Sequence, residues 1–263
     1  MNAYSDTTGA LAFDERASAV IDTLESAGYE AFLIGGCVRD ALLGRRLNDY
    51  DIATNARPEQ VLSACSAWRC IPTGAVHGTV TVLADGLSAE VTTYRADGPY
   101  SDGRHPDRVS FSDDLNSDLE RRDFTVNAMA WHPKRGLVDP LSARTDLNAA
   151  LLRAVGDPDR RFAEDALRIL RGIRLSSELS FEIEPKTYEA MIRCADGLRS
   201  VSAERITAEL SRTLMADDCR IGPGLPIWKS QFPELFGGSD EARERWMTAK
   251  QWPGWSGLLR DIA

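Results

Sequence analysis

The sequence predicts an α+β fold, in which a mixed α/β domain precedes a helical region, within a chain of 263 residues. Up to about residue 150, short apolar runs of strand length alternate with amphipathic helical patterns. Beyond it, long segments show helical spacing only. No apolar run approaches the roughly 20 residues that span a bilayer, and the first ten residues lack a signal-peptide pattern. We therefore expect a cytoplasmic protein without a membrane partner.

The first half of the chain gives alternating signals for helices and strands. From Glu15 to Ser26, apolar residues recur at helical spacing, and a glycine follows shortly after. The remaining elements expected there are a strand at Tyr29–Ile34, a helix at Val38–Leu43, a strand at Asp49–Ala53, a helix at Pro58–Ala64 and a hairpin of Thr79–Leu83 with Leu87–Tyr94.

The second half changes character. Arg95–Arg108 is rich in Gly, Pro and Asp and predicts a loop, whereas Asp118–Trp131 shows helical periodicity. Further helices are expected at Arg160–Ser177, Pro185–Leu198 and Ala203–Met215, with Ser202 as the N-cap of the last. We divide the chain into domains at 1–150, 151–220 and 221–263.

The charge is distributed unevenly. The net charge is −9, which disfavours a large nonspecific grip on nucleic acid. Residues 91–174 nevertheless hold 14 of the 31 Lys and Arg residues, so a localised basic groove is compatible with the composition. The five cysteines show no paired metal-ligand spacing, which indicates reduced thiols.

The strongest local signal is a glycine pair followed by a pair of aspartates. Gly35 and Gly36 come directly after a predicted strand, where the lack of Cβ lets a phosphate chain approach the backbone. Arg39, just beyond them, can donate to phosphate oxygens. Asp49 and Asp51 alternate along a strand, so both carboxylates point to one face and suit Mg²⁺.

Each of these features has an ordinary explanation when taken alone. A Gly-Gly pair is usually a turn, and Asp-x-Asp occurs by chance on exposed strands. Their order and spacing together favour catalysis over chance. Glu90, on the next predicted strand, is a candidate third carboxylate, with a solvent-facing glutamate as the equal alternative.

A second cluster contains Arg122, Asp123 and Asn127 at the start of the predicted helix. These side chains offer donors and an acceptor to a ribose and its phosphates. Taken alone, the cluster is typical of a capped, charged helix start.

A third cluster contains Asp165 and Arg168, three residues apart, followed by Arg171 and Arg174. On one helix the first two would project together and could hydrogen-bond the edge of a base. The two further arginines could contact phosphate. The alternative is a solvated helix face held by ion pairs.

Together the three clusters resemble the class II tRNA nucleotidyltransferases, a family that includes the bacterial poly(A) polymerases. The resemblance covers about Phe32 to Leu210. Its motifs are residues 33–40 (LIGGCVRD), 49–54 (DYDIAT), 90–95 (EVTTYR), 121–128 (RRDFTVNA), 139–140 (DP), 161–168 (RFAEDALR) and 202–206 (SAERI).

The resemblance implies a nucleotidyltransferase head with a mixed sheet of about five strands, an all-α neck and a partial body. It implies that Asp49 and Asp51 bind Mg²⁺ near Glu90, and that Gly35, Gly36 and Arg39 hold the triphosphate. Arg122, Asp123 and Asn127 would recognise the ribose.

The neck residues carry a separate expectation. Asp165 and Arg168 would select CTP and ATP, and Arg171 and Arg174 would complete the nucleotide pocket. The implied reaction adds CCA to the 3′ end of tRNA, and no obligate protein partner is evident. Residues 95–108 would form the flexible loop that helps the enzyme change from C to A addition.

Three alternatives stay open at this point. An A-adding relative is the closest; a CC-adding enzyme should lack the loop that is present at residues 100–106. A poly(A) polymerase is the second, and a non-catalytic nucleotide- or RNA-binding module is the third. The chain ends at Ala263, soon after the neck-like helices. We therefore expect either a fragment or a naturally short protein, with the affinity for tRNA most affected.

Overall fold

The protein was studied as a computed structural model that describes residues 4–5, 11, 13–47, 49–97, 109–215 and 225–231. The chain divides between Leu147 and Asn148 into two compact units, and each is described by itself. None of the helices in the described segments is long and apolar enough to cross a membrane. The predicted division into 1–150, 151–220 and 221–263 stays a prediction.

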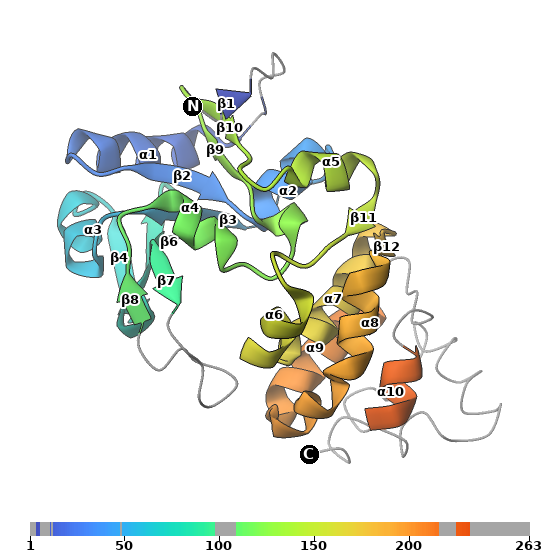
Figure 1. Ribbon diagram of the computed structural model, residues 1–263. Helices are drawn as coiled ribbons and strands as arrows, with labels where there is room; N and C mark the ends of the chain where they lie inside the picture. The colour runs from blue at the N-terminus through green and yellow to red at the C-terminus, as the bar shows by residue number, and fades with distance from the viewer. Residues whose placement is uncertain are drawn as a thin grey trace. The chain divides into compact units, whose positions relative to one another are not determined.

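The first unit is built on a mixed sheet in the order β1-β10-β9-β2-β3-β6-β5-β4 (Figure 1). β3 and β6 run parallel, and the other neighbouring pairs run antiparallel. The mixed sheet was predicted, but it has eight strands in the described residues where about five were expected. The strands are β1 (Tyr4–Ser5), β2 (Ala31–Ile34), β3 (Tyr50–Thr54), β4 (Arg69–Gly74), β5 (Thr79–Ala84), β6 (Leu87–Thr93), β9 (Ala130–His132) and β10 (Gly136–Val138).

Helices α1 (Glu15–Ser26) and α3 (Pro58–Ala64) pack along this sheet, and α2 (Gly36–Leu42) contacts β2 and β3. α1 contacts β2, β3, β5 and β6, and α3 contacts β4, β5 and β6. The predicted apolar stripe of α1 is confirmed, because Ala17, Val20, Ile21 and Leu24 are all buried. In β5 and β6 every second residue is buried, and the residues between are half-buried or exposed. One face of these strands therefore belongs to the core and the other can carry a site.

The helix predicted at Asp118–Trp131 is wrong. The structure has α4 (Leu115–Glu120), a 3-10 turn η2 (Thr125–Asn127) and then strand β9. β9 pairs with β2, with Trp131 opposite Leu33, so tertiary strand pairing overrides the local helical pattern.

The ends of the predicted loop are also ordered. Residues Arg95–Asp97 form β7, which pairs antiparallel with β8 (Val109–Phe111). The rest of the loop, residues 98–108, lies outside the described residues. The remaining elements of this unit are the 3-10 turn η1 (Ala75–His77) and α5 (Ala143–Asn148), whose last residue falls beyond the division.

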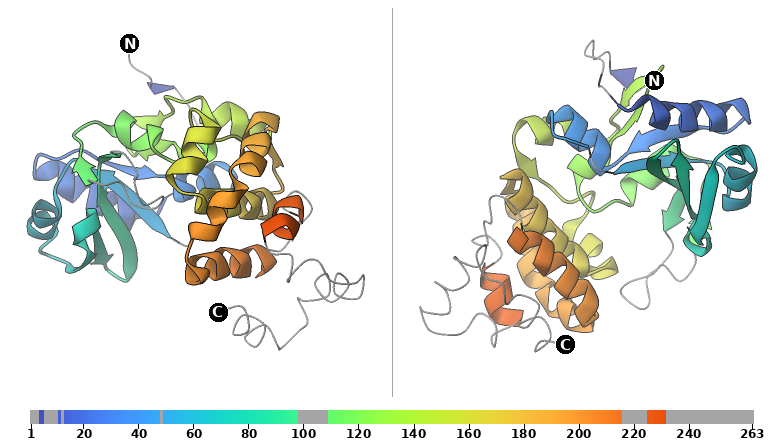
Figure 2. Two further views of the ribbon diagram at one scale, coloured as in Figure 1. Left: turned by 60° about the horizontal axis from the view of Figure 1, so that its bottom comes forward. Right: turned by 180° about the vertical axis from the view of Figure 1, so that it is seen from behind.

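The second unit is helical, with α7 against α9 and α6 against α8 (Figure 2). Its elements are α6 (Pro158–Glu164), α7 (Leu167–Leu179), α8 (Pro185–Arg193), the 3-10 turn η3 (Ala195–Ser200), α9 (Ala203–Met215), α10 (Leu225–Gln231) and the parallel strand pair β11 (Leu151–Leu152) with β12 (Glu182–Ile183). The helix predicted at Ala203–Met215 is confirmed. The one predicted at Pro185–Leu198 ends earlier, at Arg193, where η3 follows.

The single helix predicted at Arg160–Ser177 is wrong. Asp165 ends α6 in an extended conformation, with φ −151° and ψ 105°, and α7 begins at Leu167. The Asp165 carboxylate accepts the backbone N–H of Leu167 at 3.0 Å. An aspartate whose carboxylate accepts the backbone N–H two residues further on competes with helix continuation, which explains the break.

Candidate active site

The turn after β2 has a backbone conformation at its first position that favours glycine, and the end of an arginine side chain lies against it. Gly35 has φ +74°, and a Cβ there would lie 2.7 Å from Nη1 of Arg122. Its backbone N–H donates to the carbonyl of Met129 at 3.1 Å, which fixes the turn to the segment before β9. The glycine therefore allows a guanidinium to lie against the start of α2.

Arg39, on α2, is buried and bound on two sides. Its guanidinium donates to both carboxylate oxygens of Asp40 at 2.9 Å, and Nη1 donates to Oδ1 of Asn127. Asn127 in turn donates to Asp123 at 3.3 Å. The structure thus joins three of the predicted site residues, Arg39, Asp123 and Asn127, in one chain of hydrogen bonds that ties α2 to η2.

The carboxylates gather on the open face of the sheet. Asp51 in β3 is paired in register with Glu90 in the parallel strand β6, so both side chains point to the same face. Asp49 precedes Asp51 by two residues, and Asp49 and Glu90 are exposed. The structure therefore brings together all three predicted carboxylates, as the alternation along the strands requires.

The electrostatic setting of Asp51 is unfavourable for a bare carboxylate. Burial raises the pKa of Asp51, and the charges of Glu90 and Asp49 raise it further against the lowering effect of Arg122. A cation bound at this place would relieve that repulsion.

The donor set fits Mg²⁺. Within the described segments, no group of three or more His, Cys, Asp or Glu side chains is placed to hold a metal ion, so Glu90 does not join Asp49 and Asp51 in a three-carboxylate site. Mg²⁺ is usually bound by one or two carboxylates together with substrate phosphates and water, rather than by a complete cage of protein ligands. Asp49 and Asp51 beside the Gly35 turn match that mode of binding.

Cys37 lies next to these groups but offers no nucleophile. Its thiol is buried and donates to the backbone carbonyls of Ile34 and Asp51 at 3.1 and 3.8 Å. Burial raises the pKa of Cys37 to about 11. The buried thiol is therefore protonated at neutral pH, the form that is a poor nucleophile.

The sequence reasoning missed Asp118, which orients the two neighbouring arginines. Its fully buried carboxylate accepts from Arg121 at 2.6 and 3.0 Å, from Arg122 at 3.3 Å and from the backbone N–H of Arg95 at 3.2 Å. Burial alone would raise the pKa of Asp118, but Arg121 and Arg122 hold it below its ordinary value. Spacings of three and four residues on a helix were the available signal.

In the second unit, Asp165 and Arg168 take different partners. Asp165 accepts from Arg205 at 2.7 Å, whereas Arg168 donates to Glu164 at 2.7 Å and to the carbonyl of Arg161 at 3.0 Å. They do not project from one continuous helix, so that premise of the sequence reasoning is wrong. Glu164 and Arg205 are the residues that hold the predicted pair in place, and the sequence reasoning assigned neither a role.

Arg174 and Arg171 lie further along α7. Arg174 donates to Glu209 of α9 at 2.6 Å and to Glu178 at 2.8 Å, so its charge is engaged within the helical unit. Burial lowers the pKa of Arg174, but the two glutamates outweigh this and raise it. Arg171 is half-buried. The roles of both residues in nucleotide binding stay predictions.

Comparison with known proteins agrees with this geometry. Residues 31–153 match the model of the poly(A) polymerase head domain. Residues 180–222 match the model described as the probable RNA- and SrmB-binding site of polymerase A. The first match contains all the predicted site residues of the first unit, and the second begins after Arg174, the last of the predicted site residues.

Relatives of known name are similar over most of the chain. The CCA-adding enzyme of Streptococcus suis is 45% identical over 230 residues, covering 86% of this chain and 57% of the relative. The CCA-adding enzyme of Oceanobacillus iheyensis is 42% identical over 231 residues, covering 84% and 57%. The chain therefore spans little more than half the length of these relatives.

A solved structure of the same kind shares the fold. The Bacillus stearothermophilus CCA-adding enzyme in complex with CTP has a TM-score of 0.73 and 38% identity, over 82% of this chain and 51% of that one. The motifs, the sheet that carries them and these similarities agree with one another. The chain belongs to the family of class II tRNA nucleotidyltransferases and bacterial poly(A) polymerases.

Proposed function

We propose that this protein is a template-independent RNA nucleotidyltransferase that adds CCA to the 3′ end of tRNA in the cytoplasm, with CTP and ATP as substrates. The observation that carries the proposal is the placement of Asp51 beside Glu90 and two residues from Asp49, next to the Gly35 turn. The Streptococcus suis and Bacillus stearothermophilus relatives, both named CCA-adding enzymes, support it.

In this reaction the tRNA 3′-hydroxyl attacks the α-phosphate of the nucleotide and diphosphate leaves. Asp49 and Asp51 would hold Mg²⁺, which when bound neutralises charge on the phosphates. Gly35 lies against the guanidinium of Arg122 and Gly36 against that of Arg39, so two cations flank the turn that would take the triphosphate. Arg39 keeps α2 tied to Asn127 and so fixes the shape of this turn.

We assign the choice of nucleotide to the helical unit. Asp165 and Arg168 would read the edge of the base, because together they offer acceptors and donors. Their hydrogen-bond partners, Arg205 and Glu164, would hold them in orientation. Under this proposal residues 1–150 form the catalytic head and 151–220 the selecting neck.

The test is a nucleotide-by-primer assay. Purified protein receives tRNA that ends in the discriminator base, in C or in CC, with CTP or ATP alone or with both. We expect C to be added to the first two primers and A to the third. Addition of A onto CC ends only would assign an A-adding enzyme, and long A tails would assign a poly(A) polymerase. Asp49→Ala should abolish turnover and retain most tRNA binding; near-normal turnover of this variant would contradict the metal assignment.

The neck assignment has its own variant. Arg168→Ala should weaken the discrimination between CTP and UTP as well as slow the reaction. Arg160→Ala is the matched control, because Arg160 also contacts Glu164 but its side chain is 76% exposed. Unchanged discrimination in Arg168→Ala would remove the selecting role.

A further inference from the structure

The order of strands separates two sides of the carboxylate pair. Gly35 follows β2, and Arg122 and Asn127 precede β9, so the residues assigned to the incoming nucleotide lie on the β2–β9 side of β3. On the other side of β3 come β6 and then β5. In phosphoryl transfer the attacking and leaving oxygens are roughly in line across the phosphorus. A triphosphate on the β2–β9 side therefore leaves the β6–β5 side for the attacking hydroxyl.

One side chain on that side faces the carboxylates without a partner of its own. Thr81 in β5 is directly opposite Glu90, which is itself in register with Asp51, so the three form one row on the open face. Cβ atoms of such opposed residues are about 5 Å apart. Thr81 is half-buried, and within the described part of the chain its hydroxyl makes no hydrogen bond.

The next row gives a useful contrast. Thr79 and Thr92 lie opposite each other on the same face, and their hydroxyls bond to each other at 2.9 Å. Thr81 alone of these threonines therefore keeps both a donor and an acceptor for an external group. A ribose 2′-hydroxyl, which is also both donor and acceptor, is the complementary chemistry.

We propose that the 3′ end of the RNA approaches over β6 and β5, and that the Thr81 hydroxyl binds the 2′-hydroxyl of its terminal ribose. The adjacent 3′-hydroxyl then lies beside Glu90 and Asp51. This inference rests on the proposed function and adds a positioning residue to it.

The experiment compares two tRNAs that lack CCA and end either in a ribonucleotide or in the matching 2′-deoxynucleotide. With the full chain at saturating CTP, kcat/KM for the ribose-ended tRNA should be about tenfold higher, which corresponds to about 1.4 kcal/mol. Thr81→Val keeps the shape of the side chain and should lower kcat/KM for the ribose-ended tRNA to that of the deoxy-ended one. The KM for CTP should not change.

Two variants control for structure. Thr81→Ser retains the hydroxyl and should retain the preference for ribose. Thr79→Val removes a hydroxyl from the same face of the same strand and should also retain it. A Thr81→Val variant that keeps the wild-type preference would overturn the inference while leaving the proposed function intact.

A binding measurement distinguishes failure of the proposed function from failure of the Thr81 contact. If the wild-type chain transfers no nucleotide, the proposed function fails, and the Kd values for the two tRNAs then test Thr81 independently. Tighter binding of the ribose-ended tRNA that is lost in Thr81→Val would support the contact. Equal Kd values in the wild type would refute it.

Discussion

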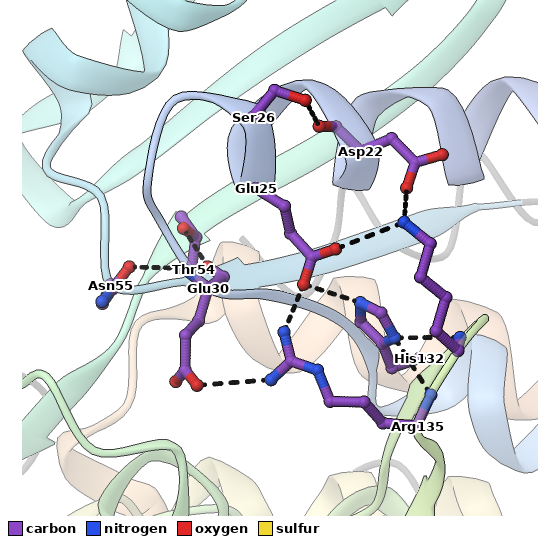
Figure 3. A network of polar contacts seen from close by, with 9 residues as sticks. Asp22, Glu25, Ser26, Glu30, Thr54, Asn55, His132 and Arg135 are labelled. Carbon is purple, nitrogen blue, oxygen red and sulfur yellow. Dashed lines mark hydrogen bonds and ion pairs between the residues drawn. The ribbon is translucent and has the colours of Figure 1, made fainter.

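The acidic side chains near the two ends of β2 have pKa values shifted in opposite directions. At the carboxyl end of β2, the Gly35 turn lies near Asp51, whose pKa is raised by burial and by the neighbouring carboxylates. At its amino end, a network of acidic and basic side chains joins α1 to β9 and to the turn after β9 (Figure 3). Burial would raise the pKa of Glu25 in that network, but Arg135 and His132 hold it below its ordinary value.

The charged side chains of the network in Figure 3 form hydrogen bonds and ion pairs with one another. His132 is buried; its Nε2 is 3.0 Å from Glu25, and its Nδ1 accepts the backbone N–H groups of Lys134 and Arg135 at 3.0 and 3.2 Å. Nε2 therefore carries the proton of a neutral ring. Arg135 also binds Glu25, and Lys134 binds Asp22 at 2.6 Å.

Charge pairing differs between a binding site and a structural network. A network whose acidic and basic side chains pair with one another stabilises the fold without a bound ligand. A carboxylate such as Asp51, whose pKa is raised by burial and by its neighbours, costs stability in its charged form, and a bound cation offsets this cost. Variants near each end of β2 test this difference.

The largest effect is expected from Asp51→Asn. Loss of the charge should lower the rate of nucleotide transfer by roughly a thousandfold or more, since metal-assisted charge stabilisation is worth several kcal/mol. The free energy of unfolding should stay unchanged or rise, because repulsion from Glu90 and Asp49 is relieved. Single-turnover assays and urea unfolding measure the two quantities. A large loss of stability would show that the carboxylate is structural.

Gly35→Ala should come next. The residue has φ +74°, and a Cβ would press against Arg122, so we expect a loss of about 1–2 kcal/mol in stability and about a hundredfold in rate. Gly28→Ala is the matched control: it has φ +91° but nothing within 4 Å of the added Cβ. The Gly28→Ala variant should lose stability but keep the wild-type rate of transfer. Equal rate losses in both variants would remove the special position of Gly35.

At the other end, Glu25→Ala should affect stability only. The variant leaves His132 and Arg135 without their shared acceptor, and we expect a loss of about 1–2 kcal/mol in the free energy of unfolding. Glu30→Ala, whose side chain is 48% exposed and contacts Arg135 at 3.3 Å, should lose about 0.5 kcal/mol or less. Transfer activity at saturating substrate should match the wild type in both; a selective loss in Glu25→Ala would contradict the division of roles.

The smallest effect concerns pH. Burial lowers the pKa of His132, against the raising effect of Glu25, so the unfolded chain takes up this proton first as the pH falls. The stability from the neutral ring is present above the ordinary histidine pKa and is lost as the pH falls through 6.5 toward the folded value. Urea unfolding at about pH 7.5 and about pH 5.5 should therefore show a smaller drop for His132→Gln than for the wild type. An equal drop in both would exclude His132 as the source.

Much of the head could be predicted because its signals are local. The stripe of α1 and the alternation in β5 and β6 follow from spacing alone. β9 could not, because three residues carry too little alternation, and its pairing with β2 depends on residues nearly 100 positions earlier. The spacing of Asp49 and Asp51 predicted a shared face, whereas the presence of Glu90 on that face depends on strand register.

The partners of the site residues were harder to predict than the residues themselves. Arg205 reaches Asp165 from 40 positions away, and no sequence period links them. Asp118 was within reach of sequence reasoning, because it lies three and four residues before the arginines that it binds. The break at Asp165 depends on which backbone N–H group its carboxylate accepts, which composition does not specify.

The placement of Asp51 and Glu90 depends on the correct register between the parallel strands β3 and β6. Asp51 and Glu90 are 39 positions apart and share a face only in the observed alignment. A slip of one position would turn one of them toward α1 and α3, among apolar neighbours where a charge is costly. Misaligned chains would thus be unstable, and they would also lose the arrangement of the two carboxylates on which the proposed function depends.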